Sequence, residues 1–82
     1  MAKEFNGHHC WNCWNVSLWI GNDEWLYRSA LECKRRPLAV SGKVPTLRTA
    51  TNRFLALVDD ARTPDGARYT FKAVYAALDG LE

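Results

Sequence analysis

Two cysteines three positions apart are the clearest candidates for chemistry in this chain. Cys10 and Cys13 form a C-x-x-C motif, His8 and His9 precede it directly, and Cys33 follows later. Zinc prefers four thiolate or imidazole ligands in a tetrahedron. One ligand set is therefore Cys10, Cys13, His8 and Cys33, although a second well-spaced pair is missing. The alternative is packing, because free cysteines usually behave as small buried apolar side chains.

Reactive-thiol chemistry fits the motif less well. A helix N-terminus can lower the pKa of one thiol in C-x-x-C, but thioredoxin-like motifs follow a strand, and nothing strand-like precedes Cys10. A catalytic cysteine–histidine pair needs an orienting third group and a pocket, and neither can be identified. Asp59 and Asp60 are interpreted as solvated surface. The sequence therefore predicts a protein that is not an enzyme and has no cofactor, with zinc as the alternative.

Composition places the chain among small globular proteins. It has 82 residues, of which 48% are hydrophobic, so we expect one domain over residues 1–82. The formal net charge of +2 is too balanced for an acidic DNA mimic or a dedicated nucleic-acid binder. Three cysteines cannot all pair within one chain, and neither a signal peptide nor a membrane-spanning stretch is recognisable. A reduced, cytoplasmic protein without a membrane partner is expected.

Apolar spacing predicts two helices in the first half of the chain. The first covers about residues 10–20 and is ended by Gly21, and its core face follows the i, i+3, i+7 pattern of Trp11, Trp14 and Leu18. The second begins after the capping residue Asn22 and stops at Pro37, and its buried face comprises Leu26, Ala30 and Cys33. Because so short a connection joins them, the two should form a Trp-rich helical hairpin or a sharp corner.

Two further helices are predicted beyond a loop at residues 37–45, which separates the two helical pairs. The apolar loop residues expected to cover an edge of the core are Leu38, Val40 and Val44. A helix near 46–62 has the apolar face Leu47, Ala50, Phe54, Leu57, Val58 and Ala61. Residues 63–66, TPDG, form a turn or start the last helix, whose apolar face is Phe71, Val74, Tyr75 and Leu78. With an extended lead-in over residues 1–9, the predicted fold class is all-α, a small bundle of about four short helices.

A basic run and two tryptophans are the candidates for partner contacts. Three consecutive basic residues end the second predicted helix, where they can contact phosphates or simply complement the helix dipole as solvated surface. Trp19 and Trp25 fall outside the main apolar stripes, and an exposed tryptophan among polar groups is a typical interface anchor. The predicted partner-binding residues are Trp19, Trp25, Arg28, Lys34, Arg35 and Arg36.

Residues 5–27, FNGHHCWNCWNVSLWIGNDEWLY, resemble the opening of a family of small uncharacterised proteins of bacteriophages and other mobile elements. Its signature runs aromatic-Asn-Gly, a gap, Asn-aromatic-Glu-Thr-Trp-Asn-Val, then Leu-Trp, Asn-Asp-Glu and Leu-Tyr. The matching residues are Phe5, Asn6, Gly7, Trp11, Trp14, Asn15, Val16, Leu18, Trp19, Asn22, Asp23, Glu24, Leu26 and Tyr27. Cys10, Asn12 and Cys13 depart from the signature, so the resemblance implies no metal site. Asn15, if buried, should bond backbone across the hairpin.

The resemblance and the lack of a catalytic constellation favour a phage-type accessory protein. It would inhibit a host defence system, as an anti-CRISPR or antirestriction protein, by binding a host protein or ribonucleoprotein complex and blocking it sterically. The near-neutral charge predicts mixed polar and aromatic contacts. The alternative is a small nucleic-acid-binding or regulatory module that uses the basic end of the second helix. The sequence leaves the oligomeric state open between a monomer and a homodimer. The implied location is the cytoplasm of an infected bacterial host.

Overall fold

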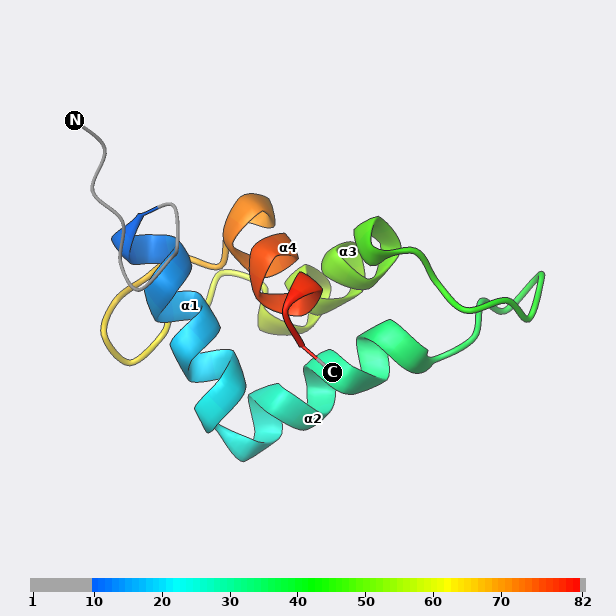
Figure 1. The fold of residues 1–82 in the computed structure, drawn as a ribbon, viewed down its shortest axis with the longest axis horizontal. Helices are drawn as coiled ribbons and strands as arrows, with labels where there is room; N and C mark the ends of the chain where they lie inside the picture. Colours follow the sequence, from blue (N-terminus) through cyan, green and yellow to red (C-terminus); the bar gives the residue numbers. More distant parts are fainter. Residues whose placement is uncertain (1–9, 82) are drawn as a thin grey trace.

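The computed structural model describes residues 10–81, which form four helices (Figure 1). These are α1 (Trp11–Asn22), α2 (Glu24–Arg35), α3 (Leu47–Val58) and α4 (Phe71–Asp79). Within residues 10–81 there is no strand, only an isolated antiparallel bridge between Arg62 and Arg68. The fold is an all-α, compact bundle of four helices, as the apolar spacing predicts. The lead-in predicted for residues 1–9 lies outside the described residues.

A single residue, Asp23, separates α1 from α2. Its backbone N–H donates to the carbonyl of Trp19, and its carboxylate accepts from the backbone N–H of Leu26 at 3.0 Å. Aspartate is a strong N-cap because its carboxylate satisfies a free N–H of the first turn. The cap is therefore Asp23 rather than Asn22, and α1 continues through Gly21. The chain turns sharply here, so α1 and α2 form the corner that was one of the two predictions (Figure 1).

The buried face of α1 differs from the predicted one. Its apolar residues are Cys13, Val16 and Ile20, which also follow i, i+3, i+7 spacing, and Asn15 is buried beside them. Trp11 and Leu18 are 39% and 36% exposed, and Trp14 is only partly buried, so the predicted core face is wrong. The packing of α1 against α4 decides between the two sets. Cys13, Val16 and Ile20 are therefore the apolar residues that α1 contributes to the core.

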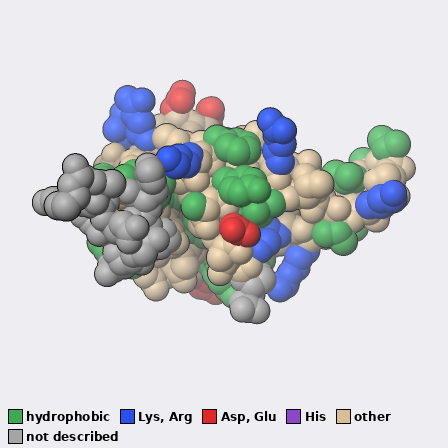
Figure 2. All heavy atoms as spheres, turned by 45° about the horizontal axis from the view of Figure 1, so that its top comes forward, with side chains coloured by type: hydrophobic (Ala, Val, Ile, Leu, Met, Phe, Trp, Pro, Cys, Tyr) green, Lys and Arg blue, Asp and Glu red, His purple; other side chains and the backbone are tan. Residues whose placement is uncertain are grey.

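The other three helices bury most of the residues that the apolar pattern predicts. The buried residues of α2 are Leu26, Ala30 and Cys33, those of α3 are Ala50, Thr51, Phe54 and Val58, and those of α4 are Ala73, Val74, Ala77 and Leu78. Phe71 and Tyr75 are instead 40% exposed each and stack on one another, with ring centroids 5.8 Å apart. Hydrophobic side chains are exposed over the middle of one face of the molecule (Figure 2). Within residues 10–81 no helix has the length and apolarity to span a bilayer.

The loop between α2 and α3 projects from one end of the molecule (Figures 1 and 2). Val40 and Val44 are 102% and 72% exposed, so the prediction that they cover the core is wrong. The loop closes on itself, since the backbone N–H of Leu38 donates to Lys43 and that of Gly42 donates to Leu38, both at 2.8 Å. Pro45 is the loop residue that is buried.

The segment between α3 and α4 is a loop rather than an extension of either helix. Helix α3 ends at Val58, four residues before the predicted end, because Asp59 adopts φ 46° and leaves the helical region. The TPDG segment is a turn, in which the backbone N–H of Gly66 donates to the carbonyl of Thr63 at 2.8 Å. Helix α4 starts after Thr70, whose hydroxyl accepts from the backbone N–H of Ala73 at 3.1 Å.

Candidate partner-binding surface

The solvent-facing side of α2 carries a tryptophan in a polar setting. The Trp25 side chain is 58% exposed. It lines a shallow depression of about 410 Å³ together with four polar residues of the same helix, Glu24, Arg28, Ser29 and Glu32. Arg28 pairs with Glu24 one turn earlier, with 2.6 Å between nitrogen and oxygen. The result is a large aromatic side chain available to solvent and bordered by both signs of charge.

A second depression of about 250 Å³ continues from the first along the boundary between α2 and α3. Its lining residues are Glu32, Cys33, Arg36, Arg53, Ala56 and Leu57. Glu32 lines both depressions, so they are neighbours along α2. Leu57 of α3 is 51% exposed and provides a second apolar group. We call the residues that line the two depressions the α2–α3 surface.

Arg53 fixes the geometry of this surface. Its guanidinium donates to three backbone carbonyls at the end of α2, those of Cys33 (3.4 Å), Arg36 (2.6 Å) and Pro37 (3.4 Å). The last carbonyls of a helix have no partner within the helix, and a cation there also complements the negative end of the dipole. Arg53 therefore caps α2 from α3 and sets the position of one helix against the other.

The structure brings half of the predicted partner-binding residues together. Trp25, Arg28 and Arg36 belong to the α2–α3 surface, and Arg35 is exposed on the same helix. Lys34 points the other way, and its ammonium donates to the carbonyls of Leu78 (2.7 Å) and Leu81 near the end of α4. The indole N–H of Trp19 donates to the Asp65 carboxylate at 2.9 Å. Lys34 and Trp19 thus make contacts within the protein.

A polar network attaches the loop before α4 to α1. Asn15, which is buried, accepts from the Thr63 hydroxyl at 2.6 Å and donates to Asp65 at 2.9 Å. These side-chain partners differ from the predicted backbone bond across the hairpin. The pKa of Asp65 is lowered by the hydrogen bonds from Asn15 and then from Trp19. The position of Asn15 among apolar neighbours indicates a buried polar contact. Its partners could not be predicted, because Thr63 and Asp65 lie about fifty positions away in the sequence.

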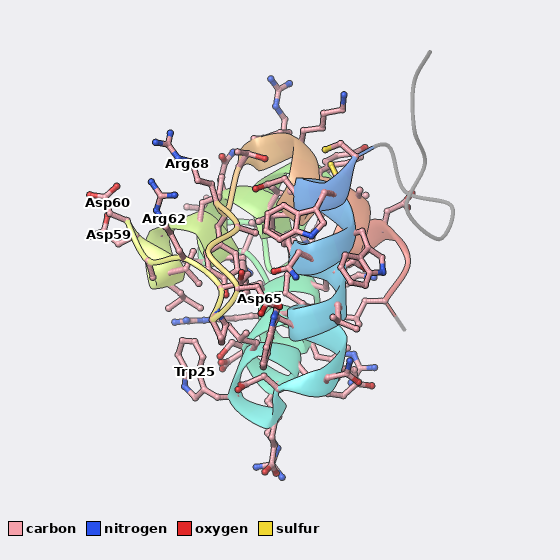
Figure 3. All side chains as sticks on the ribbon, turned by 90° about the vertical axis from the view of Figure 1, so that its left-hand side faces the viewer. Trp25, Asp59, Asp60, Arg62, Asp65 and Arg68 are labelled. Carbon is pink, nitrogen blue, oxygen red and sulfur yellow. The ribbon has the colours of Figure 1, made fainter. Side chains whose placement is uncertain are left out.

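Two arginines meet at the same loop. Arg62 and Arg68 form the isolated bridge, and Asn12 holds Arg68 by accepting from its N–H (2.9 Å) and donating to its carbonyl (2.8 Å). Both arginines line a polar depression of about 430 Å³ with Asp59 and Asp60. All four side chains project on the same side of the molecule, whereas Asp65 points toward α1 (Figure 3). The sequence analysis did not identify this depression.

The residues of the predicted zinc set are only partly described. The sulfur atoms of Cys10 and Cys13 lie 3.5 Å apart at the start of α1, and Cys13 and Cys33 are buried. In the part of the chain that the structure describes, no three His, Cys, Asp or Glu side chains gather as a metal site. His8 lies outside the described residues. Burial of Cys13 and Cys33 agrees with the packing interpretation.

Residues 1–79 match the model of a family of unknown function, DUF7249. The chain belongs to this family. The match covers all four helices, so it reaches far beyond the N-terminal third in which the signature residues lie. Among curated proteins and solved structures, no match to the chain was found. Membership of DUF7249 assigns no activity, so a functional argument has to come from the surfaces of the bundle.

Proposed function

We propose that this protein acts by binding another protein through the α2–α3 surface, with Trp25 as the anchor. The observation that carries the proposal is the 58% exposure of Trp25 beside a depression bordered by charged groups. Tryptophan and arginine are the side chains most enriched among residues that dominate binding energy at interfaces. Leaving a large indole in water without a partner loses the free energy that burial would supply.

The charges of this surface favour a protein over a nucleic acid. Glu24 and Glu32 lie among the arginines, and the Arg28–Glu24 pair neutralises one of those arginines. A strip with both signs of charge complements a protein surface of mixed charge. A phosphate backbone would be repelled by the remaining carboxylate, that of Glu32, and it gains affinity from clustered cations that release counterions.

The biological role that we propose is inhibition of a host defence system by a phage-type accessory protein. The partner would be a defence protein or ribonucleoprotein complex of the anti-CRISPR or antirestriction target class, blocked by steric occlusion. Support comes from the resemblance of residues 5–27 to a mobile-element family and from a small helical body with a surplus of exposed aromatic groups.

The test uses bacteria that express one candidate defence complex together with the tagged, full-length protein. The readouts are the plating efficiency of a sensitive phage and recovery of the complex on the tag. Replacing an anchor residue typically weakens binding by about 2 kcal/mol or more, roughly thirtyfold. We therefore expect Trp25→Ala to lose both the capture of the complex and the gain in phage plating efficiency. The matched control is Val40→Ala, which removes an exposed apolar side chain from the projecting loop, outside the surface, and should change neither.

The same samples decide between protein and nucleic acid. Capture that survives nuclease and moderate salt supports direct protein binding. Capture that disappears with nuclease, and falls when Arg35 and Arg36 are both changed to Glu, would replace the proposal with the nucleic-acid-binding module. Self-association that Trp25→Ala abolishes in sedimentation would instead make the α2–α3 surface a homodimer interface.

A further inference from the structure

The first turn of α1 brings two thiols together in unequal surroundings. Cys10 is the N-cap residue, with extended backbone (φ −156°, ψ 171°), and Cys13 lies one turn into the helix. Their sulfur atoms are 3.5 Å apart. Cys10 is partly exposed and Cys13 is buried. The Cys10 thiol is thus accessible to a dissolved reagent, and the buried Cys13 thiol lies next to it.

The electrostatic surroundings divide the two thiols further. The backbone N–H of Cys13 and the neighbouring Cys13 thiol lower the pKa of Cys10, and the N–H of Asn12 and the charge of Lys72 act in the same direction. Burial raises the pKa of Cys13. A thiolate is the reactive form of cysteine, and free N–H groups at a helix N-terminus stabilise it. Cys10 is therefore the thiol that ionises first.

We propose that Cys10 and Cys13 form a thiol–disulfide exchange site whose substrates are small disulfides such as oxidised glutathione. Neither the family nor the partner-binding proposal assigns this site. It lies on α1 and involves no residue of the α2–α3 surface, so its success or failure leaves the proposed function untouched.

The reaction has two balanced steps. The Cys10 thiolate attacks one sulfur of the small disulfide, forms a mixed disulfide and releases the other half as a thiolate, which takes up the proton that Cys10 lost. The Cys13 thiol then gives up its proton and attacks the Cys10 sulfur. This step forms the Cys10–Cys13 disulfide and expels the second half as a thiol. Two protein thiols are oxidised and one small disulfide is reduced to two thiols.

The local backbone allows this bond to close. The sulfurs must approach from 3.5 Å to about 2.05 Å. Cys10 lies outside the helical conformation, so its backbone can adjust. The helix bond from the backbone N–H of Trp14 to the Cys10 carbonyl (3.0 Å) involves no thiol. Cys33 is buried on α2 and its pKa is raised by burial. Cys33 should remain reduced and serves as an internal reference.

The experiment exposes the reduced, folded, full-length protein to oxidised glutathione and follows intact mass and peptide maps. The wild type should lose two hydrogen atoms and yield a Cys10–Cys13 disulfide. Cys13→Ser should accumulate a mixed disulfide on Cys10. Cys10→Ser should react at least about tenfold more slowly, and Cys33 should remain unmodified in the peptide maps of the wild type and of both variants. Serine is a strong N-cap residue, so Cys10→Ser is expected to keep the helix, which circular dichroism checks.

Two outcomes would overturn the proposal. The first is a wild type that stops at a glutathione adduct without closing the internal disulfide. The second is a folded wild type that does not react at either cysteine, or reacts first at Cys33. Because the wild-type peptide map alone distinguishes these results, the test remains decisive even if Cys13→Ser fails to fold.

Discussion

Asn15 uses both ends of its buried amide to hold the loop before α4. Its oxygen accepts from Thr63 and its nitrogen donates to Asp65, while the Thr63 hydroxyl also accepts from the backbone N–H of Ala67. Asn15→Ala removes two hydrogen bonds and leaves the buried Thr63 hydroxyl without its acceptor. A lost hydrogen bond and an unsatisfied buried group together cost about 2–3 kcal/mol. We expect a fall of this size in the free energy of unfolding, measured by urea denaturation.

The matched control is Asn52→Ala, which makes the same chemical change at an exposed position in α3. Alanine has the higher helix propensity, so this variant should be as stable as the wild type or slightly more stable. Equal losses in the two variants would show that the Asn15 amide contributes no more than a surface side chain.

Asp65 makes this network sensitive to pH. Its carboxylate accepts from Asn15 and Trp19, and these bonds lower its pKa below the ordinary value of 3.8. A group whose pKa is lower in the folded state stabilises the fold fully above its unfolded pKa, and this contribution is lost as the pH falls through the folded-state pKa. Asp65→Asn should therefore lower the melting temperature at neutral pH, with the difference from wild type shrinking below about pH 4.

Circular dichroism melts of the wild type and Asp65→Asn across the acid range check this expectation. The control is Asp60→Asn, which makes the same change at an exposed carboxylate earlier in the same loop. Its effect on the melting temperature should be small at every pH. A difference between wild type and Asp65→Asn that stays constant down to low pH would contradict the argument.

Helix α3 ends at Asp59, a residue with a strained backbone conformation. Asp59 adopts φ 46° and ψ −134°, a combination that side chains with a Cβ rarely take and that glycine adopts freely. Such a conformation costs about 1–3 kcal/mol, and the greater freedom of glycine in the unfolded chain offsets part of the relief. We expect Asp59→Gly to raise the free energy of unfolding by about 1 kcal/mol.

Asp60→Gly is the control, because its neighbour Asp59 has the positive φ and Asp60 does not. That variant adds freedom to the unfolded chain without relieving strain, so it should be neutral or destabilising. Chemical denaturation of both variants provides the comparison. If Asp59→Gly is the less stable of the two, the left-handed conformation at Asp59 is not a source of strain.

Helix number and type could be predicted from the sequence, whereas the orientation of α1 and the element ends could not. Periodicity identifies an amphipathic helix but does not choose between Trp11-Trp14-Leu18 and Cys13-Val16-Ile20, which have equal spacing. The choice depends on how closely α4 approaches. Likewise, no local signal in the sequence shows that the Thr63 hydroxyl donates a hydrogen bond to Asn15 instead of capping a helix.

For the molecule as a whole, some of the predicted partner-binding residues lie on the α2–α3 surface and others make contacts within the protein. Contacts between distant parts of the chain decide which residues belong to each group. Trp25, Arg28 and Arg36 could be identified because exposed positions on one amphipathic helix follow from its buried stripe. Lys34 and Trp19 instead contact Leu78 and Asp65, and these contacts could not be predicted because both partners come from the other half of the chain. Leu57 is predicted on the apolar face of its helix, and that prediction is wrong, because Leu57 is 51% exposed and lines the α2–α3 surface where α3 packs on α2.

The two halves of the chain are interdependent, which leads to a prediction for the nicked protein. Helix α1 packs on α4 and α2 packs on α3, so each half covers the core of the other. The loop that joins the halves projects into solvent and is held mainly by its own hydrogen bonds. Proteases cut first where exposed backbone is least tied to the body. Among the sites in residues 10–81, trypsin should therefore cut first after Lys43, and the two fragments should stay associated and helical.

Mass spectrometry after brief digestion, followed by size-exclusion chromatography and circular dichroism, checks both parts of this expectation. The internal comparison is with Arg62 and Arg68, which are also exposed but lie in the loop that Asn12 and Asn15 bind to α1. In Asn15→Ala these sites should become competitive with Lys43, because the tether is weakened. First cleavage at Arg62 or Arg68 in the wild type would mean that the polar network does not hold that loop. Separation of the Lys43 fragments would mean that packing between the halves is too weak to maintain the bundle without the connecting loop.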